Sequence, residues 1–340
     1  MRANLVRPRV ERGHMGKQAT ERRTLGRSGV EVTCLSLGTA PLGGLFRHVE
    51  DDTAIAVVKA ALDAGLNYID TAPLYGHGVA ERRVGAALAA AGVERSSYVL
   101  STKVGRLIVD NPAGDSDGYA DAPPSEAIFD FTPDGIRRSL EESLERLGLS
   151  AVDVVYIHDP DDYEEQALKV AYPVLHELRE QGVVKAIGTG MNQSRIPTRF
   201  VRETDIDVVL LAGRYTLLDQ TGAADLLPAC LERGTSIVIG GVYNSGLLAD
   251  PRPGATFNYA PAPPELIARA QELERVCQAH DVPLKAAAIQ FPLAHPAVAT
   301  VLTGARDVRE LTENLAMMEY DIPDALWDDL AEVGVHRYGR

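Results

Sequence analysis

Short apolar runs alternate with longer amphipathic segments along most of the chain. Eight of the runs predict β-strands, over residues 33–38, 67–71, 98–103, 152–158, 185–190, 207–212, 236–241 and 299–304. Their apolar residues are mostly continuous, which is typical of strands covered on both faces. Longer patterned segments between them predict helices over 51–65, 132–148, 164–182, 222–234 and 264–280.

Two of these helices carry recognisable end signals. The first opens on acidic residues at 51 and 52 and closes on Gly65. The second has Thr132 as a candidate N-cap, Pro133 in its first turn and Gly148 at its end.

Eight strand–helix units in this length of chain predict an α/β fold of the (β/α)8 TIM-barrel class. A doubly wound sheet is the alternative, but it favours a GxGxxG fingerprint after the first strand, and "LGTAPLGG" at 37–44 lacks that spacing. The segment 23–32 predicts a β-hairpin that closes the bottom of the barrel. We expect a single barrel domain over residues 22–340, preceded by a flexible extension over residues 1–21.

Two of the predicted strand-to-helix loops are unusually long, at 105–131 and 243–264. Loops of this length are uncommon unless they are functional or disordered. Both follow the carboxyl ends of strands, so we expect them on the C-terminal face, where barrel enzymes build their active sites.

Composition narrows the classes of partner. The 340-residue chain is 45% hydrophobic and carries a net charge of −14, which disfavours nucleic-acid backbones and anionic membranes. No apolar run is long enough to span a bilayer, and the basic start lacks the apolar core of a secretory signal. The three cysteines form no CxxC pair, so we expect reduced thiols in a cytoplasmic protein.

Four polar residues lie at or just beyond successive strand ends: Asp70, Tyr75, Lys103 and His158. A lysine near a barrel interior needs a counter-charge, and Asp70 can supply it. A cation beside a phenol favours the phenolate, so we expect Lys103 to lower the pKa of Tyr75. A histidine beside them can donate a hydrogen bond to a carbonyl or alcohol oxygen. Such a set can move a proton at an oxygen while a hydride moves at the attached carbon.

Each of these residues alone has an ordinary structural explanation. A strand-end aspartate often forms a turn, and a lysine often extends its amine to solvent. The run "HDPDD" at 158–162 could suggest a metal site, but its ligands would all come from one loop, so no metal is predicted. A Schiff-base enzyme using Lys103 is a further alternative.

The segments "YIDTAPLYGHG", "STK" and "YIH", in this order at successive strand ends, resemble the aldo-keto reductase family over residues 23–335. The resemblance implies an NAD(P)-dependent oxidoreductase in which Tyr75 is the general acid/base. Asp70 and Lys103 would tune Tyr75, and His158 would orient the substrate.

The segment 301–315 ends the last strand and opens a helix. Gly304 permits a tight turn there, Arg306 offers a phosphate-binding fork, and a helix N-terminus favours anions. It resembles the family's adenine-dinucleotide segment. By this resemblance, Asp307 and Glu310 add negative charge where a 2′-phosphate would lie, which favours NAD, whereas the positive charges of Arg306 and Arg309 favour NADP. We expect NAD as the preferred cofactor, with NADP as the alternative. The full set of expected cofactor-binding residues is Gly38, Thr39, Asp70, Met191, Asn192, Tyr243, Asn244, Ser245, Gly246, Leu247, Gly304, Arg306, Glu310, Glu313 and Asn314.

Departures from the general family pattern point to a branch. "HDPDD", "LLAGRYTLLDQ" and "GGVYNSGLLA" resemble the members that oxidise L-fucose and other D-threo-aldoses at C1, or pyridoxal at C4. We expect a sugar substrate, because Asp159, Asp161, Arg214 and Asn244 could satisfy several hydroxyls. Pyridoxal oxidation and general aldehyde or ketone reduction remain alternatives, as does a non-catalytic, cofactor-binding regulatory subunit. The sequence predicts no oligomeric state.

Overall fold

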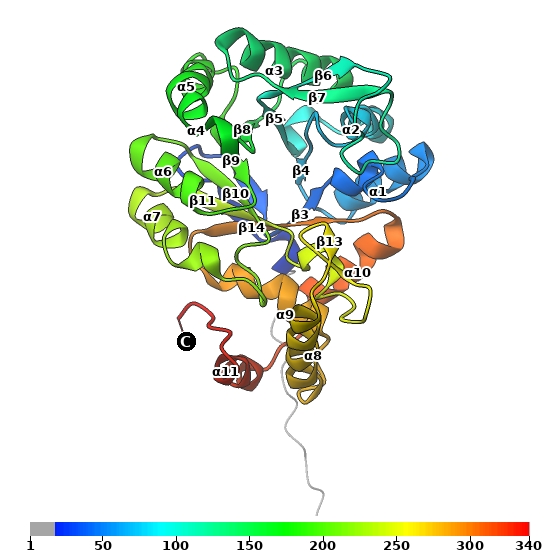
Figure 1. Cartoon of the computed structure of the whole chain (residues 1–340), viewed down its shortest axis with the longest axis vertical. Helices are drawn as coiled ribbons and strands as arrows, with labels where there is room; N and C mark the ends of the chain where they lie inside the picture. Colours follow the sequence, from blue (N-terminus) through cyan, green and yellow to red (C-terminus); the bar gives the residue numbers. More distant parts are fainter. Residues whose placement is uncertain (1–17, 340) are drawn as a thin grey trace, which may run out of the picture.

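The computed structural model describes residues 18–339 and contains a closed barrel of eight parallel strands surrounded by helices (Figure 1). Around the barrel the strand order is β10-β11-β14-β3-β4-β5-β8-β9, closed on itself. All eight predicted strands are present, as β3 (Leu35–Gly38), β4 (Tyr68–Asp70), β5 (Val99–Val104), β8 (Val154–His158), β9 (Ala186–Met191), β10 (Val208–Ala212), β11 (Ser236–Gly240) and β14 (Val298–Gly304). The predicted barrel fold is confirmed.

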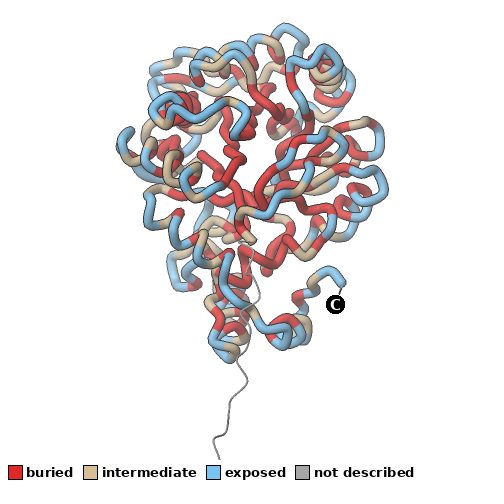
Figure 2. Tube along the Cα trace, turned by 180° about the vertical axis from the view of Figure 1, so that it is seen from behind, coloured by how far each residue is buried: buried red, intermediate tan, exposed pale blue. Residues whose placement is uncertain are grey.

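Helices cover the outside of the barrel, so the strands are buried on both faces (Figure 2). Their bounds are α1 (Asp51–Asp63), α2 (Val79–Ala91), α3 (Pro133–Leu147), α4 (Glu164–Gln166), α5 (Tyr172–Glu180), α6 (Arg195–Glu203), α7 (Leu226–Arg233), α8 (Pro264–Gln278), α9 (Leu284–Gln290), α10 (Val308–Met318) and α11 (Asp324–Glu332). A π-helical segment, η5 (Ala167–Ala171), joins α4 to α5. None of the helices in the described part of the chain is long and apolar enough to cross a membrane.

The predicted caps of α3 are present. Thr132 Oγ1 accepts a hydrogen bond from the Gly135 amide at 3.1 Å, and Gly148 ends the helix at φ +65°. Helix α2, which the sequence pattern did not indicate, starts after Gly78 without a side-chain cap, although Gly92 ends it at φ +61°.

The predicted hairpin closes the bottom of the barrel. Strands β1 (Arg22–Thr24) and β2 (Glu31–Thr33) pair antiparallel, and Leu25 between them packs among the inward residues of the barrel. The Gly26 amide donates to Ser236 Oγ at 2.7 Å, at the start of β11. Of the extension predicted over 1–21, residues 1–17 lie outside the described residues. Within the rest of that extension, Gln18–Thr20 form a 3₁₀ turn, and the Ala19 amide donates to Glu319 Oε1 at 2.7 Å.

The two long segments on the C-terminal face are only partly loops. Residues 105–131 contain an antiparallel hairpin of β6 (Arg106–Asp110) and β7 (Ser125–Phe129). Residues 243–264 contain η7 (Asn244–Gly246) and a short hairpin of β12 (Thr256–Phe257) and β13 (Ala260–Pro261). The sequence predicted no conformation for these two segments; in the structure, backbone pairing in the two hairpins satisfies the polar groups of the hairpin residues.

Candidate active site

The alternation of side chains along three neighbouring strands brings the predicted polar residues together. Successive residues of a strand point to opposite faces, and in β4, β5 and β8 the residues Tyr68, Val99, Val154 and Tyr156 lie in the cluster that fills the barrel interior. Asp70, Lys103 and His158 share that inward parity and are the last inward residues of their strands. Because parallel strands end at the same edge, the three side chains meet at the C-terminal mouth.

Asp70 and Lys103 form a buried ion pair. Lys103 Nζ donates to Asp70 Oδ2 at 2.7 Å and to the Thr71 carbonyl oxygen at 2.9 Å. The two residues are only 0% and 1% exposed, so neither charge is solvated by bulk water. The counter-charge that the sequence required for Lys103 is therefore Asp70, as expected.

Tyr75 lies against this pair. Lys103 Nζ is 4.5 Å from the centre of the Tyr75 ring, and the His158 ring lies edge-on at 6.1 Å between centroids. The loop that carries Tyr75 packs backbone to backbone on the loop after β3: a Cβ atom at Gly43 would lie 2.6 Å from the Tyr75 carbonyl carbon. All four residues of the predicted catalytic set thus lie together at one rim.

The expected direction of the Tyr75 pKa is corrected by the structure. Burial raises the pKa of Tyr75 well above its usual value of 10, and the Asp70 carboxylate raises it further. Burial, which the sequence pattern does not give, is the larger cause of this difference, and the negative charge of Asp70 adds to it by opposing a phenolate. In this state Tyr75 is a neutral phenol.

His158 is also held neutral. Burial lowers the pKa of His158 well below 6.5, and the positive charges of Lys103 and Arg106 lower it further. Its Nδ1 atom is buried without a hydrogen-bond partner, and its Nε2 atom lies 3.5 Å from Asp159 Oδ2. A neutral imidazole with unused hydrogen-bonding capacity can bind an oxygen of a ligand.

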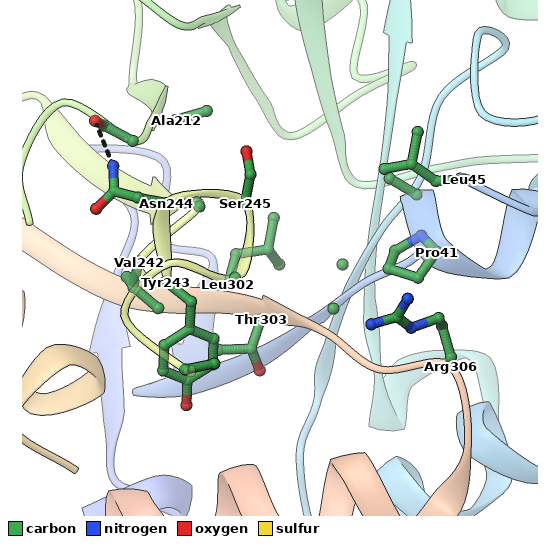
Figure 3. Close-up of a pocket in the computed structure, with 18 of the residues that line it drawn as sticks. Pro41, Leu45, Ala212, Val242, Tyr243, Asn244, Ser245, Leu302, Thr303 and Arg306 are labelled. Carbon is green, nitrogen blue, oxygen red and sulfur yellow. Dashed lines mark hydrogen bonds between the residues drawn. The ribbon is translucent and has the colours of Figure 1, made fainter. Parts of the chain in front are cut away.

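A cleft of about 580 Å³ at the barrel mouth is lined by Tyr75 as well as by residues of α10. Figure 3 shows Tyr243, Asn244 and Ser245 on one side of it and Arg306 on the other. Twelve of the residues expected to bind the cofactor line the cleft: Gly38, Asp70, Asn192, Tyr243, Asn244, Ser245, Gly246, Gly304, Arg306, Glu310, Glu313 and Asn314.

Three residues expected to bind the cofactor do not line the cleft. Met191 is the last residue of β9, and its side chain points outward into the core between strands and helices, because Gly190 takes the inward position. Leu247 is fully buried in the same core. Thr39 is fully buried as well, and its Oγ1 donates to the Asp70 carbonyl oxygen at 2.9 Å.

The end of the cleft at α10 differs from the expectation in two details. Gly304 makes no left-handed turn; a Cβ atom there would lie 2.5 Å from Pro41 Cγ, so it is the close approach that requires glycine. Asp307 is the N-cap of α10, and its Oδ1 accepts from the Glu310 amide at 2.8 Å. Glu310 accepts from the Arg306 amide at 2.9 Å and lies 3.5 Å from Arg47.

Some residues around the mouth were not indicated by the sequence. Arg106 pairs with Asp159 at 3.3 Å, and its Nε atom is buried without a partner. The Tyr119 ring lies 6.4 Å from that of Tyr75, and Phe46 lies 6.1 Å from Tyr259 on the tip of the β12–β13 hairpin. These residues come from the long segments on the C-terminal face or, for Phe46, from the loop after β3, so only their presence on that face could have indicated them.

Comparison with known proteins shows which proteins this chain resembles. The chain is 45% identical over 314 residues to a D-threo-aldose 1-dehydrogenase from a Pseudomonas species, covering 90% of this chain and 95% of that protein. It is 41% identical to a pyridoxal 4-dehydrogenase from Microbacterium luteolum, covering 94% and 99%. A solved glycerol dehydrogenase from Gluconobacter oxydans shares the fold, with a TM-score of 0.73 at 23% identity, covering 95% of this chain and 97% of that one.

The sequence model of the Aldo/keto reductase family matches residues 34–334, which include the whole barrel and the cleft. This chain therefore belongs to the aldo-keto reductases and is an oxidoreductase.

Proposed function

We propose that the protein oxidises the C1 hemiacetal of an aldose, such as L-fucose or another D-threo-aldose, to the lactone, with NAD as hydride acceptor. The observation that carries the proposal is the buried Asp70–Lys103 pair lying against Tyr75 at the cleft. A buried ion pair is a costly feature that contributes little to stability by itself, so its place beside a phenol at a cleft supports a chemical role.

The cleft fits a nicotinamide dinucleotide. The Asn244 Oδ1 atom is buried without a partner, while its Nδ2 donates to the Gly213 carbonyl oxygen at 3.3 Å (Figure 3, dashed line). Arg306 supplies a guanidinium for phosphate at the other end. Tyr243, whose hydroxyl donates to Asn314 Oδ1 at 3.0 Å, adds an aromatic ring to the cleft wall. When bound, the oxidised dinucleotide supplies the hydride acceptor and a positive charge at the nicotinamide.

The protein's own residues would handle the proton. Tyr75 would accept the hydroxyl proton of the hemiacetal, and Lys103 would stabilise the tyrosinate that forms. Because the pKa of Tyr75 is raised in the protein alone, the positive charge of the oxidised cofactor would add to that of Lys103 in favouring its action as a base. Neutral His158 would hydrogen-bond the sugar oxygen and hold it near Tyr75.

A polyhydroxylated substrate is supported by the polar groups beside His158. Asp159 is held at φ +44°, a conformation that a non-glycine residue seldom adopts, and its carboxylate pairs with Arg106. Arg106 keeps a buried Nε without a partner, which a sugar hydroxyl could satisfy. The D-threo-aldose dehydrogenase relative points to the same substrate class.

Pyridoxal is the second candidate. The rings of Tyr119 and Tyr75 lie 6.4 Å apart, which suits an aromatic substrate, and the pyridoxal dehydrogenase relative supports this alternative.

The preference for NAD is supported by Glu310, which places a carboxylate in the cleft close to Arg306. Asp307 contributes less than the sequence suggested, since its carboxylate caps α10.

The proposal is tested by following nicotinamide reduction with L-fucose, D-arabinose, L-galactose and pyridoxal, each with NAD and with NADP. We expect turnover of at least one aldose with NAD and its loss in Tyr75→Phe. Turnover of pyridoxal alone would replace the sugar by pyridoxal. Absence of turnover with every substrate would favour a non-catalytic, cofactor-binding role.

A further inference from the structure

The barrel interior directly below the Asp70–Lys103 pair is polar. Tyr68, Ser101 and Tyr156 lie two residues before Asp70, Lys103 and His158 on β4, β5 and β8, and therefore point into the barrel as well. All three are 0% exposed. Interiors of barrels of this class are usually filled by branched aliphatic side chains, and a buried hydroxyl is costly unless it is hydrogen-bonded. Three adjacent hydroxyls at this depth therefore call for an explanation.

The three hydroxyls form a continuous chain that ends on Asp70. Ser101 Oγ donates to Asp70 Oδ1 at 2.6 Å, and Tyr68 Oη donates to Ser101 Oγ at 3.0 Å. The Tyr68 and Tyr156 hydroxyls are 2.9 Å apart. Because the one proton of Tyr68 is given to Ser101, Tyr156 must be the donor of this last bond. Three hydrogen bonds thus point in one direction, toward the carboxylate, and each polarises the next.

The two carboxylate oxygens of Asp70 accept hydrogen bonds from different donors. Asp70 Oδ1 accepts from Ser101, and Oδ2 accepts from Lys103 at 2.7 Å. Without the serine, the carboxylate could rotate about its Cβ–Cγ bond. Its negative charge, no longer shared with a hydrogen bond from Ser101, would then offset more of the positive charge of Lys103. That ammonium would then stabilise a tyrosinate at Tyr75 less well.

We propose that Ser101, Tyr68 and Tyr156 are positioning residues that hold and polarise Asp70, and so set how far the Lys103 ammonium acts on Tyr75. This inference rests on the proposed function, because it requires Tyr75 to exchange a proton during turnover. None of the three lines the cleft, and the hydrogen bonds that join them end on Asp70.

Other charged and titratable groups face the same site and bear on any pH profile. Lys103 and Arg106 shift the pKa of His158, while Asp70, Asp159, Tyr119 and Tyr259 shift that of Tyr75. Asp70 and Asp153 act on Tyr68, and Tyr68 and Asp70 act on Tyr156. A change in the pH profile of kcat is therefore informative only under two conditions. It must decrease from Ser101 to Tyr68 to Tyr156, the order of the hydrogen bonds, and it must be missing in a matched control.

The test compares Ser101→Ala, Tyr68→Phe and Tyr156→Phe with Ser36→Ala, measuring kcat against pH for oxidation of the best substrate of the wild-type enzyme. Ser36 is a suitable control because its hydroxyl is equally buried in the barrel but bonds Thr300 Oγ1 at 2.6 Å. The phenylalanine variants remove only a hydroxyl, so they guard against misfolding of the serine variant. Ser101→Thr keeps the donor and serves as the conservative rescue.

We expect kcat of Ser101→Ala to fall about tenfold or more, and the pH at which Tyr75 becomes a base to rise by about half a unit or more. Tyr68→Phe should show a smaller shift in the same direction and Tyr156→Phe the smallest, with Ser36→Ala unchanged. Shifts absent from Ser101→Ala and Tyr68→Phe, or equal in Ser36→Ala, would overturn the inference. A wild-type enzyme inactive on every substrate would instead remove the proposed function, and with it this role.

Discussion

The buried pair of Asp70 and Lys103 makes a quantitative prediction about both stability and activity. Lys103→Met would leave the Asp70 carboxylate fully buried, with its 2.6 Å bond from Ser101 but without the ammonium at 2.7 Å. Breaking a buried ion pair by removing one partner costs about 3–5 kcal/mol, because the remaining charge is uncompensated. We expect Lys103→Met to lose a free energy of unfolding in this range.

The double variant Asp70→Asn/Lys103→Met separates the charge effect from packing. Asparagine is close in shape to aspartate and carries no charge, so the double variant should recover about 2 kcal/mol or more relative to Lys103→Met. Both variants should lose about 100-fold or more in kcat, because neither has a cation beside Tyr75.

Urea unfolding followed by circular dichroism measures the free energies, and steady-state oxidation measures kcat. A double variant no more stable than Lys103→Met would show that the two charges are not coupled as their distance implies. Retention of most of the wild-type kcat in Lys103→Met would refute the role of the ammonium, whatever the stability result.

Three further predictions concern the substrate, the cofactor and the pH dependence of folding. Asp159→Asn should lower kcat/KM for an aldose about tenfold more than for an aromatic aldehyde without hydroxyls, because the substitution weakens the ion pair with Arg106. Equal losses for the two substrates in steady-state assays would count against recognition of sugar hydroxyls by this pair. Glu310→Gln should lower the ratio of kcat/KM for NAD to kcat/KM for NADP about threefold or more. Asp307→Ser keeps an N-cap and should change this ratio less. A larger effect of Asp307→Ser than of Glu310→Gln would contradict the placement of the two carboxylates. Burial lowers the pKa of His295 to about 4, so the unfolded chain binds more protons than the folded one between that pH and about 6.5, and stability should fall as pH drops through this window. The loss should be smaller in His295→Gln when urea unfolding is measured at both ends of the window, and an unchanged loss would exclude His295 as its source.

Much of the site could be predicted because it depends on strand periodicity. Parallel strands end at one edge, so polar residues such as Asp70, Lys103 and His158 at successive strand ends must meet. The same periodicity could also have found the chain of Tyr68, Ser101 and Tyr156, since each lies two residues before one of them. Met191 was expected at the cofactor because of the family resemblance, whereas its side chain lies in the core outside the barrel strands.

The electrostatic state of the site could not be obtained in this way. Whether Lys103 lowers the pKa of Tyr75 depends on burial and on where Asp70 lies, and both are three-dimensional quantities. Similarly, Asp307 and Glu310 are equally acidic in the sequence, but one is engaged as a helix cap while the other lines the cleft.

By itself, therefore, the sequence determined the barrel, its strand ends and the identity of the four residues at the rim, because these follow from local pattern and from the geometry of parallel strands. Only the tertiary structure decided which side chains line the cleft and which form helix caps or the core. It also brought Tyr119 and Tyr259 from distant segments close to Tyr75, and Arg106 close to His158. The reason is physical: periodicity is a property of neighbouring residues, whereas burial and the distance between charges depend on the whole folded chain.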